Sequence, residues 1–419
     1  MMKKITAICM SVIILLTGSV LFTACSSKND VVEIDFFQHN QADEETFNKI
    51  IADFHSEYPN IRVKQICLPE KTADSVITMR FQNNDIPDIF NSWFAQNIID
   101  AFDAGQIRDL TDTDFVQYID AGILEELKYN GRIFMLPITK NFMGVFYNRD
   151  IFEQHNISVP LTLEEFWAVC ETLPSKGVLP IIAADQDGWN LAHWAQSLMG
   201  MYLPNYSADF KAIFNGSLRG SKIQGISDFA DIVIRRTQYV QDNPLGTVTD
   251  PAVSEFVLGR AAMFLNGSYM TASIETANPN LNYGIFPFPG STESETRVMS
   301  NADYSFFLSA QSSPEKTEAA ETFMMYMLTH GAAYYIEQTK APSSIIGVTA
   351  DSSRYELVKD VMDEGRVFRM PYMGRWNLAT YLEYTVALQN LVASSNKDTF
   401  YKEFEESMTS VGMPKTYID

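Results

Sequence analysis

The chain is too long for a single hydrophobic core. It has 419 residues, whereas single cores stop growing at about 250 to 300 residues, so two lobes are expected. Hydrophobic residues make up 46% and aromatic residues 12% of the chain, which excludes intrinsic disorder. The formal net charge of −21 indicates a solvated acidic surface and argues against a nucleic-acid partner, because binding to phosphates needs a basic face.

The amino terminus has the pattern of an export signal. Lys3 and Lys4 precede an apolar stretch over residues 5–24, which ends in small residues before Cys25. A stretch of about 20 apolar residues could instead remain in the bilayer as a transmembrane helix. Small residues followed by cysteine resemble a bacterial lipoprotein signal. The resemblance implies a signal peptide over residues 1–24, lipid attachment at Cys25 and a polar tether over residues 25–30, which would hold the protein on the outer side of the cell membrane.

Two further cysteines lie in the body of the chain, Cys67 and Cys170. They are far apart in sequence and belong to no disulfide framework. Two buried thiols are therefore favoured over a disulfide, although an exported protein could form one.

The first elements predict a parallel sheet. A strand is expected over residues 32–37 and a second over 61–66, and between them apolar residues from Phe47 to Tyr58 recur at helical spacing. Strand, helix and strand in this order form a βαβ unit, which places helices against a parallel sheet. Another strand is expected over residues 87–90.

Local signals mark later elements. Asn130-Gly131 predicts a tight hairpin turn, and strands are expected over residues 142–147, 261–265, 282–286 and 305–308. Thr162 and Glu165 form a predicted capping box. Asp250 is expected to cap a helix in which Pro251 occupies the first position.

The common catalytic and metal-binding motifs are absent from the sequence. It contains no nucleotide-binding glycine motif, serine hydrolase elbow or paired-cysteine metal motif, and its five histidines are widely spaced, so neither a metal nor a cofactor is expected. Asp185 and Asp187 could serve as an acid pair in a glycoside hydrolase. A polar turn is the favoured interpretation of this pair.

Aromatic rings beside amide or hydroxyl groups recur after predicted strands and in loops. Ligands bind outside the carboxyl ends of strands in open α/β sheets, and sugars pack their C–H faces on rings while their hydroxyls need hydrogen-bonding partners. Each cluster alone could be a turn or a packing feature, but together they favour one ligand cleft. The candidate ligand-binding residues from these clusters are Gln38, His39, Asn40, Ser92, Trp93, Trp189, Asn190, His193, Asn266, Gly267, Tyr269, Asp303, Trp376 and Asn377.

Several motifs occur in the order typical of one family. The lipoprotein-like start is followed by residues 129–137, 144–152, 159–166 and 259–268, and this series resembles the extracellular solute-binding proteins of carbohydrate importers. The resemblance implies an α/β, two-lobed, type II periplasmic-binding-protein-like fold, with a mixed, mostly parallel sheet flanked by helices in each lobe. Residues 31–140 plus about 299–342 would form the amino-terminal lobe, and residues 141–298 plus about 343–419 the carboxy-terminal lobe.

The resemblance also assigns roles to individual residues. Asn141 is expected near the hinge and facing the sugar, while Tyr269, Trp376 and Trp189 are expected to stack on sugar rings. Tyr269 stands where relatives commonly carry tryptophan.

The resemblance implies a receptor without catalytic activity. Such a receptor closes on a mono- or oligosaccharide and delivers it to a membrane permease driven by an ATPase; a monomer is expected. A non-sugar cargo such as a polyamine or peptide, and an exported glycoside hydrolase, remain as alternatives.

Overall fold

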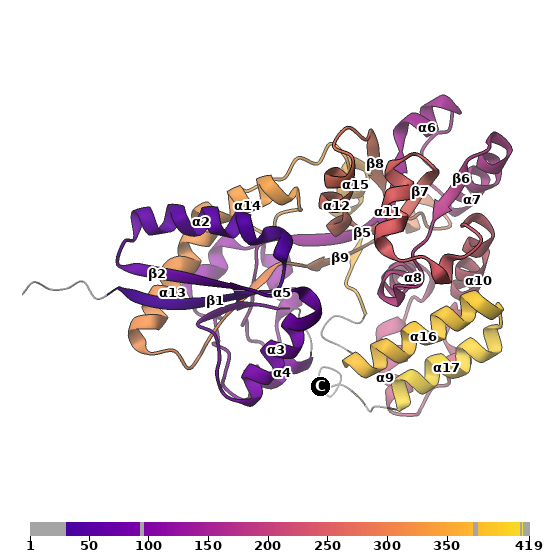
Figure 1. The fold of residues 1–419 in the computed structure, drawn as a ribbon. Coiled ribbons are helices and arrows are strands. Elements are labelled where there is room, and N and C mark those ends of the chain that lie inside the picture. The colour runs from indigo at the N-terminus through magenta and orange to yellow at the C-terminus, as the bar shows by residue number, and fades with distance from the viewer. Residues whose placement is uncertain (1–30, 93–95, 372–375, 411–412, 414–419) are drawn as a thin grey trace, which may run out of the picture.

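The computed structural model describes residues 31–92, 96–371, 376–410 and 413. Two lobes, called here the N-lobe and the C-lobe, are joined by segments that cross between them (Figure 1). The predicted signal peptide, the tether with Cys25, and Trp93 lie outside the described residues. Within the described ranges, no helix is both long and apolar enough to cross a bilayer.

The N-lobe is built on a five-stranded sheet in the order β2-β1-β3-β10-β4. β1 pairs parallel with β2 and with β3, whereas β10 pairs antiparallel with β3 and β4. The predicted βαβ unit is confirmed, since helix α2 connects β1 to β2. The strands are β1 (Val32–Gln38), β2 (Ile61–Cys67), β3 (Ile89–Asn91), β4 (Leu136–Pro137) and β10 (Ser305–Leu308).

Neighbouring aromatic side chains on one strand lie on opposite faces of this sheet, because side chains alternate along a strand. Phe36 packs into one core cluster together with Phe306, while Phe37 and Phe307 pack into another. All four rings are at most 1% exposed. The helices of the N-lobe are α2 (Glu44–Glu57), α3 (Glu70–Gln82), α4 (Gln96–Asp103), α5 (Ala121–Leu127), α13 (Pro314–Tyr326) and α14 (Ala332–Thr339).

The C-lobe sheet has the strand order β11-β9-β5-β7-β6, with β8 also paired to β5. The sheets are mixed as expected, but parallel pairs do not predominate: the long central strand β5 is antiparallel to β7, β8 and β9. The strands are β5 (Lys140–Asn148), β6 (Leu179–Ile182), β7 (Ala261–Gly267), β8 (Tyr283–Phe286), β9 (Val298–Ala302) and β11 (Val367–Phe368).

Alternation along β5 also separates two cores. Met143 and Val145 face a large cluster formed with α8, α10, α16 and α17, whereas Phe142 and Phe146 face a smaller one with α11, α12 and α15. The helices of the C-lobe are α6 (Arg149–Gln154), α7 (Leu163–Thr172), α8 (Gly188–Tyr202), α9 (Tyr206–Phe214), α10 (Ile226–Arg236), α11 (Thr249–Val257), α12 (Thr271–Ala277), α15 (Glu356–Asp363), α16 (Leu378–Ser394) and α17 (Lys397–Thr409).

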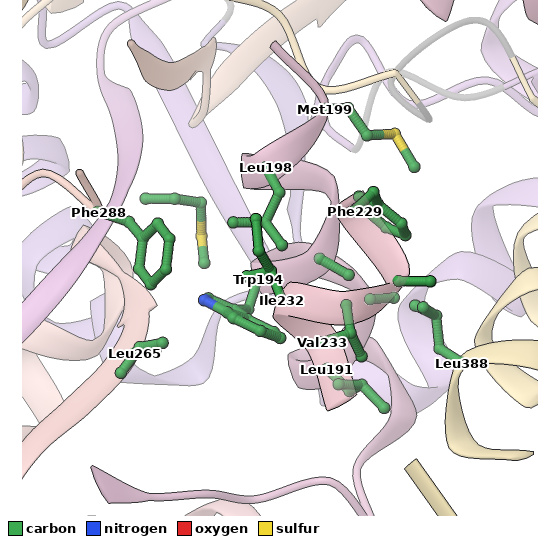
Figure 2. Packing of buried hydrophobic residues seen from close by; sticks show 14 of the residues in the cluster. Leu191, Trp194, Leu198, Met199, Phe229, Ile232, Val233, Leu265, Phe288 and Leu388 are labelled. Atoms are coloured by element: carbon green, nitrogen blue, oxygen red, sulfur yellow. The ribbon is translucent and has the colours of Figure 1, made fainter. Parts of the chain in front are cut away.

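Trp194 of α8 lies in the middle of the larger cluster. Figure 2 shows its indole between Phe288 and Leu265 on one side and Ile232 and Val233 of α10 on the other. The Phe288 ring meets it edge-on at 6.0 Å between centroids. The packing fixes α8, whose first turn supplies several of the predicted ligand residues.

Three segments cross between the lobes and run side by side. The first leads from β4 into β5, the second from β9 into β10, and the third from α14 to α15. The backbone of Thr139 accepts a hydrogen bond from Asp303 N at 2.9 Å, and Lys140 N donates to Pro342 O at 2.8 Å. Sheet membership changes between residues 302 and 305, because β9 belongs to the C-lobe sheet and β10 to the N-lobe sheet.

Two local signals gave the expected structure and a third did not. Asn130 and Gly131 both have positive φ in a tight turn bridged by Tyr129 and Arg132, and Thr162 forms the predicted capping box. Asp250 is not an N-cap: α11 begins at Thr249.

The cap of α11 comes from a distant residue. The Thr249 backbone N–H and hydroxyl both donate to the Asp187 carboxylate at 2.7 Å. A contact between segments far apart in sequence therefore replaces the local signal.

Candidate functional site

The crossing strands bring amide, hydroxyl and carboxylate groups together. Asn141, the second residue of β5, donates from Nδ2 to Asp303 Oδ1 at 3.2 Å and faces Asn301 Nδ2 at 3.4 Å from its Oδ1. Ser300 holds the same strand by donating to Asn141 O at 2.8 Å. Asn141 and Asp303, which the sequence analysis selected separately, are therefore neighbours at the hinge.

Asp303 lies in an environment that disfavours its charge. The pKa of its carboxyl is raised from the ordinary 3.8 to about 6, mainly because of burial; the Asn141 hydrogen bond lowers it and the nearby Asp43 charge raises it. A carboxyl with this pKa accepts hydrogen bonds above about pH 6 and can donate one below it.

Three rings of the C-lobe meet beside this carboxyl. Trp189 and His193 lie one turn apart on α8 and their ring centroids are 5.6 Å apart, while Tyr269 follows β7 at 6.1 Å from Trp189. The indole of Trp189 is 36% exposed, so part of this ring remains available to a ligand. The three rings are called here the ring cluster. Trp189 and Tyr269 were predicted to stack on sugar rings, and His193 was predicted as a ligand-binding residue.

Hydrogen bonding orders the ring cluster. The Tyr269 hydroxyl lies 3.1 Å from His193 Nδ1, and burial lowers the pKa of His193 to about 4. Burial, with the nearby Asp303 charge, raises the pKa of Tyr269. At neutral pH both groups are uncharged, which suits hydrogen bonding to an uncharged ligand.

Two buried asparagines lie behind the ring cluster. Asn266 Nδ2 donates to Asn190 Oδ1 at 3.1 Å, and Asn266 Oδ1 accepts from Gly267 N at 2.8 Å. The Asn190 amide nitrogen has no hydrogen-bond partner among the described residues. A buried donor of this kind gains from a ligand acceptor.

The need for glycine at position 267 has a steric cause that the sequence alone did not reveal. A Cβ at this position would lie 2.1 Å from Cε1 of Tyr269. The glycine therefore makes room for the Tyr269 ring, whereas the sequence analysis expected Gly267 to contact a ligand.

The N-lobe contributes the carboxyl end of β1. Gln38 Oε1 accepts from Asn40 N at 2.7 Å and from the Tyr304 hydroxyl at 3.3 Å, and Asn40 Nδ2 donates to Asp43 at 2.7 Å. His39 stacks on Tyr304 with 6.0 Å between ring centroids. Because Tyr304 follows Asp303 in the chain, these groups lie close to the crossing strands.

His39 is held in its neutral form. Burial lowers its pKa to about 4, although hydrogen bonds with Asn91 act in the opposite direction. Ser92, at the end of β3, is 4% exposed. The predicted residues on the N-lobe side are therefore mostly covered in this structure.

Other predicted residues lie apart from this group. Trp376 is 1% exposed and packs against Phe210 and Tyr384 in the larger core of the C-lobe, so it offers no open ring face here. Asn377 caps α16 by accepting from Thr380 N at 2.8 Å.

The carboxylate pair considered for hydrolysis has structural partners. Asp185 forms a buried ion pair with Arg236, and Asp187 caps α11. Across the ranges described, no three metal-ligating side chains lie close enough together to hold an ion.

Three polar residues beside the candidate ligand residues were not predicted from the sequence. Asp43 accepts from Asn40 and from the Tyr335 hydroxyl, and the Tyr381 ring lies 6.2 Å from His193. Tyr381 could have been found one helical turn after the capping residue Asn377. Asp43 and Tyr335 are brought together by tertiary packing and had no local signal.

The fold and the site define a two-lobed binding protein with a polar, ring-lined region at its hinge. The chain matches the family model described as bacterial extracellular solute-binding protein over residues 49–359. It therefore belongs to this family, in which the members are receptors for solutes.

Curated relatives span most of the chain. The multiple sugar-binding protein of Streptococcus mutans is 29% identical over 353 residues, covering 80% of this chain and 82% of the relative. The melibiose/raffinose/stachyose-binding protein MelE of Bacillus subtilis is 23% identical over 349 residues, covering 80% and 78%.

Solved structures share the fold. RafE in its apo form, from Streptococcus pneumoniae, superposes with a TM-score of 0.81 at 23% identity, covering 92% of this chain and 99% of RafE. RafE in complex with raffinose gives a TM-score of 0.80 at 23% identity, covering 90% and 99%. The expected two-lobed α/β fold is confirmed.

Proposed function

We propose that the protein is the extracytoplasmic receptor of an ABC-type sugar importer, binding a mono- or oligosaccharide between the lobes. The ring cluster beside Asn141 and Asp303 carries this proposal. Rings supply stacking surfaces for sugar C–H faces, and the amide and carboxyl groups supply partners for hydroxyls. The names of the relatives support a sugar cargo, since they include multiple sugar-binding, raffinose-binding and stachyose-binding proteins.

The charges of the site favour a neutral sugar. Among the described candidate ligand residues, Asp303 is the one with a formal charge at neutral pH, and both histidines have pKa values of about 4. No lysine or arginine is among these candidates. A uronic acid would therefore meet a carboxylate without a compensating cation.

Binding would act through closure of the lobes. The candidate residues come from both sides of the crossing strands, with Gln38 and His39 on the N-lobe and Trp189 and Tyr269 on the C-lobe. A ligand shifts the equilibrium toward the closed form only by its differential affinity for that form, so contacts to both lobes are needed. The closed form would then be recognised by the permease.

Isothermal titration with melibiose, raffinose and stachyose tests the cargo. Binding near micromolar affinity, about −8 kcal/mol, is expected for at least one of them, and titration with galacturonate should give no signal. Spermidine and a tripeptide serve as the competing cargo classes. Binding of either one with no sugar response would refute the sugar assignment.

The absence of catalysis is tested on the same samples. Chromatography after prolonged incubation with the bound sugar should return it uncleaved, because a receptor binds without chemistry. Release of a monosaccharide would identify a glycoside hydrolase instead.

Attachment to the membrane through Cys25 is a further part of the proposal. The residue follows the small residues of an export signal, and acyl chains on it would anchor a domain that has no described membrane-spanning helix. Expression in a bacterial host should place the wild type in the membrane fraction, whereas Cys25→Ser should remain unlipidated by mass spectrometry. A Cys25→Ser protein carrying the same lipid mass would refute this assignment.

A further inference from the structure

A cavity of about 60 Å³ lies beside the third crossing segment. Residues on both sides of the change of lobe line it, and it is called here the hinge cavity. Its lining residues are Ser268, Thr271, Glu275, Tyr283, Ile285, Lys340, Pro342, Asp351, Arg354 and Tyr355.

The hinge cavity and the ring cluster lie on opposite faces of the C-lobe sheet. Tyr283 and Ile285 belong to the core that α11, α12 and α15 cover, and Tyr355 packs against it. Trp189 and His193 come from α8, which packs on the other face. In Figure 1, α12, α14 and α15 lie above strands β5 and β9, and α8 lies below them.

The residues that follow β7 connect the hinge cavity to the ring cluster. Ser268 lines the hinge cavity and accepts a hydrogen bond from Phe142 N of β5 at 3.1 Å, while the next residue, Tyr269, joins the ring cluster. Because Trp189 and His193 lie on the face of the sheet opposite to the hinge cavity, we expect a rotation that closes the lobes on these rings to separate the walls of the hinge cavity.

Two of the four charged groups of the cavity neutralise each other. Arg354 forms an ion pair with Glu275 and donates to the Tyr283 hydroxyl at 2.9 Å. Lys340 and Asp351 remain. Neither belongs to an ion pair within 4.0 Å among the described residues, yet the Lys340 charge lowers the pKa of Asp351, after the larger effect of hydrogen bonds from Ser353.

These two residues stand on different lobes. Lys340 is the C-cap of α14, whose Ala332 and Tyr335 lie in the N-lobe core. Asp351 precedes α15, whose Val358 lies in the C-lobe core, and the change of lobe falls between them. The attraction between Lys340 and Asp351 therefore acts across the hinge.

Lys340 has a backbone conformation that is uncommon for lysine. Its φ of 57° is left-handed, at a helix end where glycine or asparagine is usual. A cationic side chain at this end also interacts favourably with the helix dipole, and Lys340 lines the hinge cavity.

We propose that the hinge cavity controls lobe closure, with the attraction between Lys340 and Asp351 favouring the open form and so lowering affinity at the ligand site. The effect on affinity rests on the proposed sugar-binding function, but the effect on lobe separation does not. Because both groups are exposed, salt screens the attraction.

Lobe separation is measured without ligand by electron spin resonance between labels at Glu45→Cys and Leu382→Cys, in a Cys67→Ser background. Both labelled positions are exposed, Glu45 on α2 of the N-lobe and Leu382 on α16 of the C-lobe. At an ionic strength of about 0.02 M, Lys340→Gln and Asp351→Asn should each shift the distribution toward shorter distances, and at about 0.3 M the wild type should move toward the variants.

In a raffinose titration, the shift toward the closed form should appear as tighter binding. Each neutral variant should bind about two- to fivefold more tightly than the wild type, the range expected for an exposed charge pair. Lys340→Asp should favour closure further through repulsion, and the exchange variant Lys340→Asp with Asp351→Lys should return to wild-type values. Lys49→Gln, which removes an equally exposed charge paired with Asp53 on α2, should change neither measurement.

Label distances that are identical in the wild type, Lys340→Gln and Asp351→Asn at low salt would overturn the inference. Failure of the exchange variant to restore the wild-type distance would also overturn it. A distance shift in a protein that binds no sugar would support control by the hinge cavity while refuting the proposed cargo.

Discussion

Replacing Asp303 with asparagine should stabilise the free protein while weakening its ligand site. The pKa of Asp303 is about 6 in the folded protein, against an ordinary value of 3.8. Each tenfold change in a proton equilibrium corresponds to 1.36 kcal/mol, so at pH 8 folding costs on the order of 3 kcal/mol for burying this charge. Asparagine has the same shape, can still accept from Asn141, and carries no charge.

The sign of the pH dependence follows from the raised pKa. Above about pH 6 the folded protein contains a desolvated carboxylate, so Asp303→Asn should raise the free energy of unfolding by about 3 kcal/mol. The gain should shrink between about pH 6 and pH 4 and vanish below that, where the carboxyl is protonated in both states. His39 and His193 are common to both proteins and cancel in the comparison.

Urea unfolding followed by circular dichroism at about pH 8 and about pH 4 measures this difference. Asp109→Asn is a control of opposite sign at an exposed position. Desolvation raises the pKa of Asp109, but the pKa is lowered on balance, mainly by hydrogen bonds from Thr111, so this change should destabilise the protein at pH 8. A gain for Asp303→Asn that is equal at both pH values, or no gain at pH 8, would refute the reasoning.

Substitutions at three other positions test the ring cluster and the C-lobe core. Tyr269→Ala should weaken raffinose binding by about 1 kcal/mol or more, and Tyr269→Phe by less, as measured by titration; equal affinity in all three proteins would remove Tyr269 from the site. Asp185→Asn leaves the buried Arg236 without its charge partner and should lower the free energy of unfolding by about 3 to 5 kcal/mol, so an unchanged urea midpoint would contradict this. Gly144→Ala places a Cβ 2.7 Å from Ile285 Cγ2 and should cost about 1 to 3 kcal/mol in the same assay; wild-type stability would show that Ile285 moves aside freely.

Much of the fold was predictable where the signal is local. Alternation and helical spacing placed β1, α2 and β2 to within a few residues, because each element buries one face of its own segment. The cap of α11 was not predictable in this way. Asp187 reaches Thr249 from a different part of the sequence, so Asp250 was wrongly expected to cap the helix.

The candidate site was predictable as a set of strand ends but not as a set of contacts. Asn141, Asp303 and Tyr269 lie on or beside strands β5, β9 and β7. Trp189 and His193 come from α8, which packs on the same sheet. The roles of individual residues depend on tertiary packing, which the spacing of residues in the sequence does not reveal. Trp376 enters the core beside Tyr384, and Gly267 accommodates a neighbouring ring.

The distribution of tryptophans gives the protein an optical signal of its own. Trp167, Trp194 and Trp376 are at most 3% exposed, whereas Trp189 is 36% exposed. Among these four described indoles, quenching by iodide should therefore act on Trp189 and spare the three buried ones, and Trp93→Phe removes the fifth tryptophan of the chain from the signal. A sugar stacked on Trp189 would shield it, so the loss of quenching on titration would report occupancy of the ligand site without any attached dye.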